Sequence, residues 1–483
     1  MVYHMSCSVI EMKRFAMLGE SRRGRSSELV HAFFVEQLIP TGHILRRLDS
    51  VLDTKWVREE VRRFYSEKTG RPSWDPEVIL RMMLLGFLYG YSEKRLCDEL
   101  QMHLGFRWFC LLQPSEAVPD RTTLVKLRNE RWQQELWATL LDKTIQACAK
   151  AGLVSGRHVA LDGTIIQANA AQGSVEPIEP PLSLRDHLLE RCGWVKFIPP
   201  KGEDEARKPG DDDPMPGCSA DFRGESRSNA THCSTTDPDA MLYRKGSATG
   251  AQLAYLGHFC LDTKSRVILA AMATQAHTSA EWVAGATLLD EANVRVGGRI
   301  KVVSADAGYG VTRFLAEVEA RELEPHIPVQ GKVEERPEPP LAPRGRKIVR
   351  LDAARRARLK RLAVRGRNKA VRAKRTRAYA ISRKLRIRIE HAFGEAKTCH
   401  ALGRARHRGL AKVNRQVLMT ATVLNLKRLM VWVGRRRSME ASAPMAAATA
   451  VLCAFSAPSR LLALMTADLR RHLLPTTTAP AHA

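Results

Sequence analysis

The sequence of 483 residues lacks several features that mark common protein classes. Its ten cysteines form no CxxC pair and no Cys/His cluster with zinc-ligand spacing, which indicates reduced, mostly structural thiols. The most apolar stretch near the C-terminus, APMAAATAVLCAFSAPSRLLALM, contains Pro458 and Arg460, so a transmembrane helix is not expected there. The N-terminus lacks the charged-then-apolar pattern of a signal peptide. These absences favour a cytoplasmic protein without a membrane partner.

Acidic residues are also scarce relative to basic ones. Lys and Arg number 77 against 51 Asp and Glu, which gives a formal net charge of +26 and a pI of about 10.0. Such a charge attracts polyanions, and nucleic acid is the commonest partner of a basic protein. An anionic membrane surface is the other option, but the sequence shows no basic amphipathic anchor. Hydrophobic residues make up 44%, as in ordinary globular proteins, so we expect a folded protein that binds a polyanion.

Residues 27–140 have the pattern of an all-helical domain. Apolar residues recur there at three- and four-residue spacing, and Asp75 followed by Pro76 is typical of a helix start. A further helix is predicted in VPDRTTLVKLRNERW, with its arginine and lysine side chains on the face opposite Leu124 and Leu127. Basic outer faces suit docking to DNA, although solvated charges on an ordinary helical bundle explain the pattern equally well.

A different pattern begins at GRHVALDGTIIQAN, residues 156–169, which predicts a strand that is either continuous or bent at Gly163. Further strands are expected in QLAYLGHFCLD, RVILAAMAT, RIKVVSADAGYG and EPHIPV, and helices in SAEWVAGATLLDEANVR and VTRFLAEVEAREL. In the helix that starts at Ser279, Glu281 is typical of a first turn. The order of elements predicts an α/β (α+β) fold, a mixed sheet with helices packed on it.

We therefore place the second domain at 156–433, with insertions at about 171–240 and 331–378. The first insertion is rich in Pro, Gly, Ser and Asp, and the second is proline-rich and then strongly basic. Its basic run either tracks DNA as part of the fold or forms a disordered tether. Residues 1–26 are expected to be an extension, with Met17 as the true start, and 434–483 an Ala- and Pro-rich tail of unknown role.

Three acids interrupt or end the elements of this second domain. Asp162 interrupts an apolar strand, Asp306 follows another, and Glu390 stands in a basic helix. Buried carboxylates are usually paired or metal-bound, and oxygen ligands suit Mg²⁺ or Mn²⁺. Two such ions support phosphodiester chemistry. Each acid taken singly is more often an ordinary strand-end or surface carboxylate. Arg386 and Lys397 share one helical stripe with Glu390.

These residues carry a resemblance to a known family. The spacing Arg386, Glu390, Lys397 resembles the Tyr-Arg-Glu-Lys signature of DDE transposases from bacterial insertion sequences, with Arg383 at the position of the tyrosine. The segments LDGTIIQANA and VVSADAGYG are similar to the blocks around the first two acids of that family. FFVEQLIPTGHILRRLD and the segment from RPSWDPEV to VPDRTTLVKLR resemble its N-terminal helical domain.

The resemblance implies an RNase H-like core in which Asp162, Asp306 and Glu390 are catalytic and bind Mg²⁺ or Mn²⁺. It implies contacts to double-stranded DNA by Arg386, Lys397 and Arg383. The expected reaction is metal-dependent cleavage and strand transfer at the element's terminal inverted repeats, by a homodimer on DNA in the cytoplasm, associated with the nucleoid. The alternatives are a catalytically decayed transposase that only binds DNA, and a related nuclease without strand transfer.

Overall fold

The computed structural model describes residues 35–66, 72–132, 134–178, 227–244, 250–339 and 347–455, with the backbone alone at 134, 347–353 and 438–455. The predicted extension at 1–26, most of the first insertion and the end of the tail lie outside these residues. The chain divides into one unit that ends at Met430 and a second that begins at Val431.

The N-terminal part is helical, as the apolar spacing predicted. Asp75 caps α5 by accepting a hydrogen bond from the Glu77 amide at 2.9 Å, and Pro76 is the first helical residue. The last helix, α9, continues ten residues past the predicted limit at 140. The elements are α2 Val35–Leu38, α3 Ile44–Asp49, α4 Val57–Arg62, α5 Pro76–Leu88, α6 Glu93–Met102, α7 Leu104–Phe109, α8 Arg121–Lys126, the π-helical turn η1 Leu127–Arg131 and α9 Gln134–Lys150.

The core of the second part is a mixed sheet, which confirms the predicted fold class. Its order is β4-β5-β1-β7-β8, and β6 also pairs with β5. β1 is antiparallel to β5 and parallel to β7, and β7 is parallel to β8. The strands are β1 His158–Gln167, β4 Met241–Tyr243, β5 Gln252–Asp262, β6 Ile268–Gln275, β7 Val302–Ser304 and β8 Glu324–His326; β2 Val175–Pro177 and β3 His232–Ser234 form a separate pair.

β1 runs straight through Gly163, so the alternative of a bend there is wrong. Its pairing with β5 is unbroken, with Asp162 opposite Phe259 and Gly163 opposite His258. A Cβ at Gly163 would lie 3.0 Å from His258 Nδ1 and 3.2 Å from a carboxylate oxygen of Glu281. Glycine is therefore required for close packing against this face of the sheet and not for a turn.

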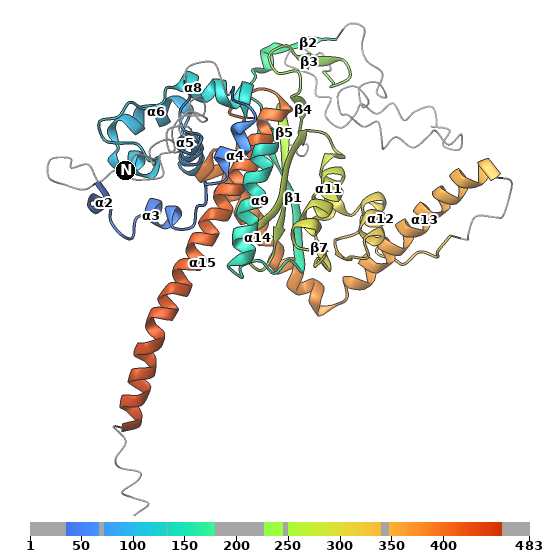
Figure 1. The fold of residues 1–483 in the computed structure, drawn as a ribbon. Coiled ribbons are helices and arrows are strands. Elements are labelled where there is room, and N and C mark those ends of the chain that lie inside the picture. The colour runs from blue at the N-terminus through green and yellow to red at the C-terminus, as the bar shows by residue number, and fades with distance from the viewer. Residues whose placement is uncertain are drawn as a thin grey trace, which may run out of the picture. The chain divides into compact units, whose positions relative to one another are not determined.

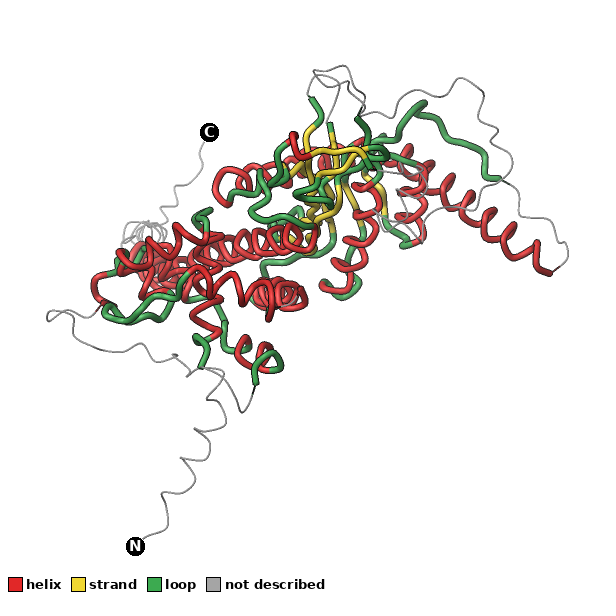
Figure 2. Tube along the Cα trace, turned by 90° about the horizontal axis from the view of Figure 1, so that it is seen from above, coloured by secondary structure: helices red, strands yellow, loops and turns green. Residues whose placement is uncertain are grey.

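Helices cover both faces of the sheet (Figures 1 and 2). Because side chains alternate along a strand, Asp162 and Gly163 face opposite sides. On the Gly163 side lies α11 Ala280–Arg295, followed by the 3₁₀ turn η4 Ala307–Tyr309 and by α12 Thr312–Ala320. On the Asp162 side lies α14 Arg377–His400, whose Phe393 stacks on Phe259 with ring centroids 4.5 Å apart. This stacking holds α14 against the strand that carries Asp162.

The helix α15 is Leu410–Phe455, and its first part, which belongs to the same unit as the sheet, lies along the edge strand β6. Asn425 accepts from the Ile268 amide at 2.8 Å, and Asn414 accepts from the Ala273 amide at 2.7 Å, so side-chain amides satisfy backbone groups of β6. The part Leu410–Arg437 is long and apolar enough to cross a membrane, but 67% of its most apolar window is buried inside the protein. That burial is typical of a core helix.

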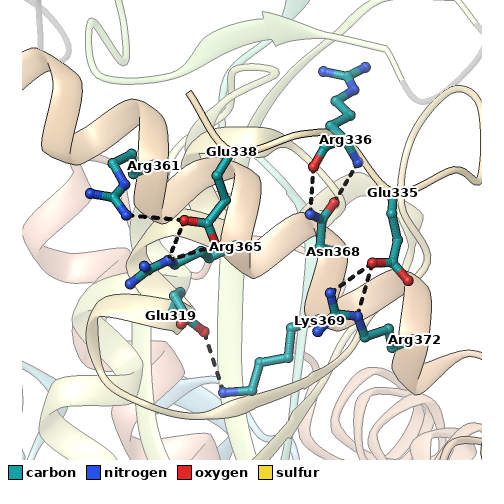
Figure 3. Close-up of polar contacts among 9 residues, drawn as sticks. All are labelled: Glu319, Glu335, Arg336, Glu338, Arg361, Arg365, Asn368, Lys369 and Arg372. Carbon is teal, nitrogen blue, oxygen red and sulfur yellow. Dashed lines mark hydrogen bonds and ion pairs between the residues drawn. The ribbon is translucent and has the colours of Figure 1, made fainter. Parts of the chain in front are cut away.

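The basic run in the second predicted insertion is a helix, α13 Lys347–Ala373, so the alternative of a disordered tether is wrong. A Cβ on Gly366 would lie 2.1 Å from the Leu315 carbonyl oxygen, which shows how closely α13 packs on α12. Figure 3 shows that residues 335–338 run beside this helix. Glu335 pairs with Arg372 at 2.7 Å, and the Arg336 backbone and the Asn368 side chain exchange two hydrogen bonds.

Candidate active site

Arg386 brings two of the three predicted acids together. Its Nη2 donates to Glu390 Oε1 at 2.7 Å on the same helix, as the four-residue spacing predicted, and its Nη1 lies 3.7 Å from Asp162 Oδ2 on β1. The Asp162 side chain is 15% exposed and that of Glu390 is 48% exposed. Two carboxylates more than 200 residues apart in the chain thus share one guanidinium near the surface.

Asp306 lies beyond the end of the neighbouring strand. Ala160 on β1 is level with Ser304 on β7, and these strands are parallel. Asp162 is two residues after Ala160 in β1, and Asp306 is two residues after Ser304, just past the end of β7. Asp306 caps the turn η4 by accepting from the Gly308 amide at 2.9 Å. The topology thus places the second predicted acid beside the first.

A fourth carboxylate, Glu281, belongs to the same region and was assigned from the sequence only to a helix start. A Cβ at Gly163 would lie 3.2 Å from its Oε1, and a Cβ at Gly308 would lie 3.1 Å from its Oε2. Glu281 on α11 therefore reaches the glycine that follows Asp162 and the glycine two residues after Asp306. The glycine near each aspartate was the only sequence signal for such a close approach.

Tyr309 is a second residue that the sequence did not single out. It is fully buried, and its hydroxyl has no hydrogen-bond partner. Burial raises the pKa of Tyr309 well above its ordinary value, and the negative charges of Glu281, Asp162 and Asp306 raise it further. The phenol is therefore protonated at neutral pH, and its hydroxyl is a donor within electrostatic reach of three carboxylates.

His258 completes the surroundings of Gly163. Its Nε2 and the Thr274 hydroxyl are 2.8 Å apart, while its Nδ1 is buried without a partner. Burial lowers the pKa of His258 to about 3, and the neighbouring His277 adds to the lowering. This imidazole is therefore neutral at pH 7 and adds no positive charge beside the carboxylates.

The other predicted DNA contacts lie on α14. Arg383 and Lys397 are exposed there, on the helix that carries Glu390. A neighbouring arginine has a structural role instead, since Arg388 donates to the carbonyl oxygens of Thr263 and Lys264 in the turn between β5 and β6. Arg383 and Lys397 thus lie at the surface that also bears Glu390.

The residues present fit a hard divalent cation in their chemistry. Asp162, Asp306 and Glu390 offer only carboxylate oxygens, which are the donors that Mg²⁺ and Mn²⁺ prefer. Glu281, on the Gly163 face of the sheet, adds a fourth carboxylate near Asp306. Within the described ranges, no three Asp, Glu, His or Cys side chains gather at metal-ligand spacing. In this arrangement the Arg386 guanidinium supplies the positive charge between Asp162 and Glu390.

Two family models match the chain. Residues 33–130 match a transposase domain (DUF772), and residues 229–426 match a transposase DDE domain, so Asp306 and Glu390 lie inside a match and Asp162 lies between the two. No solved structure matches the chain. The DDE domain has an RNase H-like fold, in agreement with the mixed sheet and its flanking helices. The chain belongs to the DDE transposases of insertion sequences, DNA-binding enzymes of transposition.

Proposed function

We propose that this transposase cleaves DNA at the terminal inverted repeats of its own element and joins the freed end to target DNA, with Mg²⁺ or Mn²⁺ as cofactor. The observation that carries the proposal is the shared contact of Asp162 and Glu390 with Arg386, beside the strand end that bears Asp306. Distant acids brought together near the protein surface are typical of a site for chemistry rather than of a folding core.

In this proposal Asp162, Asp306 and Glu390 are catalytic and hold the metal. Two Mg²⁺ or Mn²⁺ ions held by these residues would supply activation of a water or a 3′-hydroxyl and stabilisation of the leaving oxygen of a phosphodiester. The chain's own cations position the DNA. Arg386 stands next to the acids, so its guanidinium would bind a phosphate close to the cleaved bond. Arg383 and Lys397, exposed on the same helix, would bind flanking phosphates.

The remaining assignments concern the DNA as a whole. We infer that the N-terminal helices recognise the inverted repeat, and that the exposed side of α13, which carries Arg355, Arg358 and Lys360, follows the flanking backbone. Each chain would have one active site, whereas an element has two ends. A homodimer on DNA would therefore supply one active site for each end. Its place of action would be the cytoplasm, at the nucleoid.

The test is cleavage of a labelled duplex that carries the element's own end, in Mg²⁺, in Mn²⁺ and in EDTA. We expect wild type to cut only with the metal. Glu390→Gln replaces a carboxylate by a neutral amide and should lower cleavage by about 100-fold or more. DNA binding should stay within about threefold of wild type, because the phosphate contacts come from other residues. The exposed Glu334→Gln serves as the matched control and should cut normally.

Other outcomes of the same assay point to other functions. A protein that binds the end but never cuts it with either metal would be a decayed transposase, an option motivated by Arg383 in place of the signature tyrosine. A protein that cuts but does not join the end to a target would be a nuclease.

A further inference from the structure

A pocket lies between the N-terminal helices and the catalytic core, and none of the four carboxylates is among its lining residues. Its volume is about 490 Å³. One side is formed by the end of α5, the start of α6 and the helical segment 121–128, and the other by residues 401–407 and α15. The two sides come from the two matched family regions, so the pocket exists only in the folded unit.

The charge of the pocket is strongly unbalanced. Glu93 is the only acid among its lining residues, and the basic ones are Lys94, Arg121, Arg128, Arg404, Arg406 and Arg415. Glu93 is already engaged, because its Oε1 lies 3.0 Å from Arg128 Nε and 3.7 Å from His407 Nε2. One carboxylate therefore faces several cations.

Two of these arginines are deeply buried. Arg128 is 8% exposed and Arg415 is 7% exposed. The sequence placed Arg128 on a solvated outer face, and that expectation is wrong, since the π-helical turn η1 carries it inward. Arg415 Nη1 donates to the Arg128 carbonyl oxygen at 3.1 Å, but its Nη2 is buried without any hydrogen-bond partner. Arg415 is one of the residues that line the pocket.

Arg406 has a different role. Its guanidinium donates to the carbonyl oxygen of Tyr91 at 2.9 Å and, at 3.4 Å, to those of Gly86 and His400, and it stacks over the Phe87 ring. These contacts join α5 to the segment after α14. Arg406 therefore holds the pocket walls together, whereas Arg415 keeps a free donor.

The electrostatics show an environment that lacks negative charge. Burial lowers the pKa of Arg415 to about 9, and the adjacent Arg128 lowers it further. Burial also lowers the pKa of His407 to about 3, so this imidazole is neutral and adds no charge. A buried cation with an unsatisfied donor is costly, and an anion in the pocket would lower that cost.

We propose that this pocket is an anion site that binds a phosphate group, with Arg415 as its main donor and Arg128 beside it. A guanidinium binds phosphate oxygens through parallel N–H groups, and the pocket is larger than a single phosphate requires. The phosphate belongs either to the DNA backbone or to a free phosphate or nucleotide. Neither source requires cleavage, so the site stands apart from the catalytic proposal.

The first experiment measures the Tm of the full-length protein in inorganic phosphate against chloride at matched ionic strength. We expect phosphate to raise the Tm of wild type by about 2 °C or more. Arg415→Met should lose this specific rise, and it should be at least as stable as wild type without phosphate because the uncompensated charge is gone. The exposed Arg95→Gln, outside the lining, is the matched control and should keep the full response.

Glu93→Gln provides a variant that acts in the opposite direction. Removing the only competing carboxylate should strengthen phosphate binding at least threefold, and this result does not depend on whether Arg415→Met folds. A phosphate response that is equal in wild type, Arg415→Met and Glu93→Gln would be general stabilisation by an excluded anion and would overturn the proposal.

Binding of a short duplex distinguishes the two sources. If a backbone phosphate fills the pocket, Arg415→Met lowers duplex affinity about tenfold and inorganic phosphate competes with DNA more strongly than its ionic strength explains. If the occupant is free phosphate or a nucleotide, wild type shows the rise in Tm with phosphate and Arg415→Met loses it, but the two proteins bind the duplex with equal affinity. No specific Tm response together with no competition would refute the site.

Discussion

At the residue scale, the Tyr309 hydroxyl is buried without a hydrogen-bond partner, and the charges of Glu281, Asp162 and Asp306 act on it. We expect Tyr309→Phe to leave stability unchanged or raise it by about 1 kcal/mol, because an unsatisfied buried hydroxyl is lost. If the hydroxyl orients the acids, cleavage should fall about tenfold. Chemical denaturation and the duplex cleavage assay measure the two effects separately.

Tyr255→Phe is the matched control, since its hydroxyl donates to Asp237 Oδ1 at 2.6 Å. Its loss should lower stability by about 1–3 kcal/mol. Equal cleavage by Tyr309→Phe and wild type would exclude a part for this hydroxyl in the reaction.

His258 predicts a pH dependence of stability. Its pKa is about 3 in the folded protein and about 6.5 when unfolded, so the unfolded state binds more protons between these values. The stability that comes from this neutral imidazole is complete above pH 6.5 and is lost as the pH falls toward 3. Denaturation at pH 7, 6, 5 and 4 should show a decline that His258→Asn reduces, whereas the exposed His391→Asn should keep the wild-type slope.

At the element scale, the contact between α12 and α13 depends on one glycine. A Cβ at Gly366 would meet the Leu315 carbonyl oxygen at 2.1 Å, and backbone cannot move aside cheaply. We expect Gly366→Ala to separate the two helices and lower stability by about 2 kcal/mol or more. Thermal unfolding measures the loss.

Gly394 in α14 is the matched control, because a Cβ there meets nothing within 4 Å. Gly394→Ala should raise stability by about 0.5–1 kcal/mol through helix propensity alone. A Gly366→Ala protein as stable as wild type would show that α13 does not pack on α12 in solution.

At the scale of the whole molecule, the net charge of +26 predicts DNA binding that weakens steeply with salt. Replacing Arg355, Arg358 and Lys360 on exposed α13 with Gln should weaken duplex binding and reduce the salt slope by about 1 for each phosphate contact that is lost. Affinity measured at several salt concentrations gives the slope.

The control replaces Lys150, Lys264 and Lys301, three exposed lysines outside α13, with Gln. Both triple variants lose the same charge, so a general field effect would change them equally. A larger change in the α13 variant would locate the DNA on that helix, whereas equal changes would contradict its proposed role.

The sequence by itself determined what depends on neighbours along the chain. The Asp75 cap, the Arg386–Glu390 pair and the alternation of strands and helices follow from fixed local spacing, and the resemblance to DDE transposases added the assignment of Asp162 and Asp306. Each of these depends on residues in one element or on one motif.

The tertiary structure decided which distant side chains meet. Glu281 reaches Gly163 and Gly308 because α11 packs on that side of the sheet and neither glycine has a side chain in the way. Arginine is usually exposed to solvent, but Arg128 and Arg415 are buried where helices from the two matched regions pack against each other. Local periodicity cannot predict such contacts, since they depend on how complete elements pack against one another.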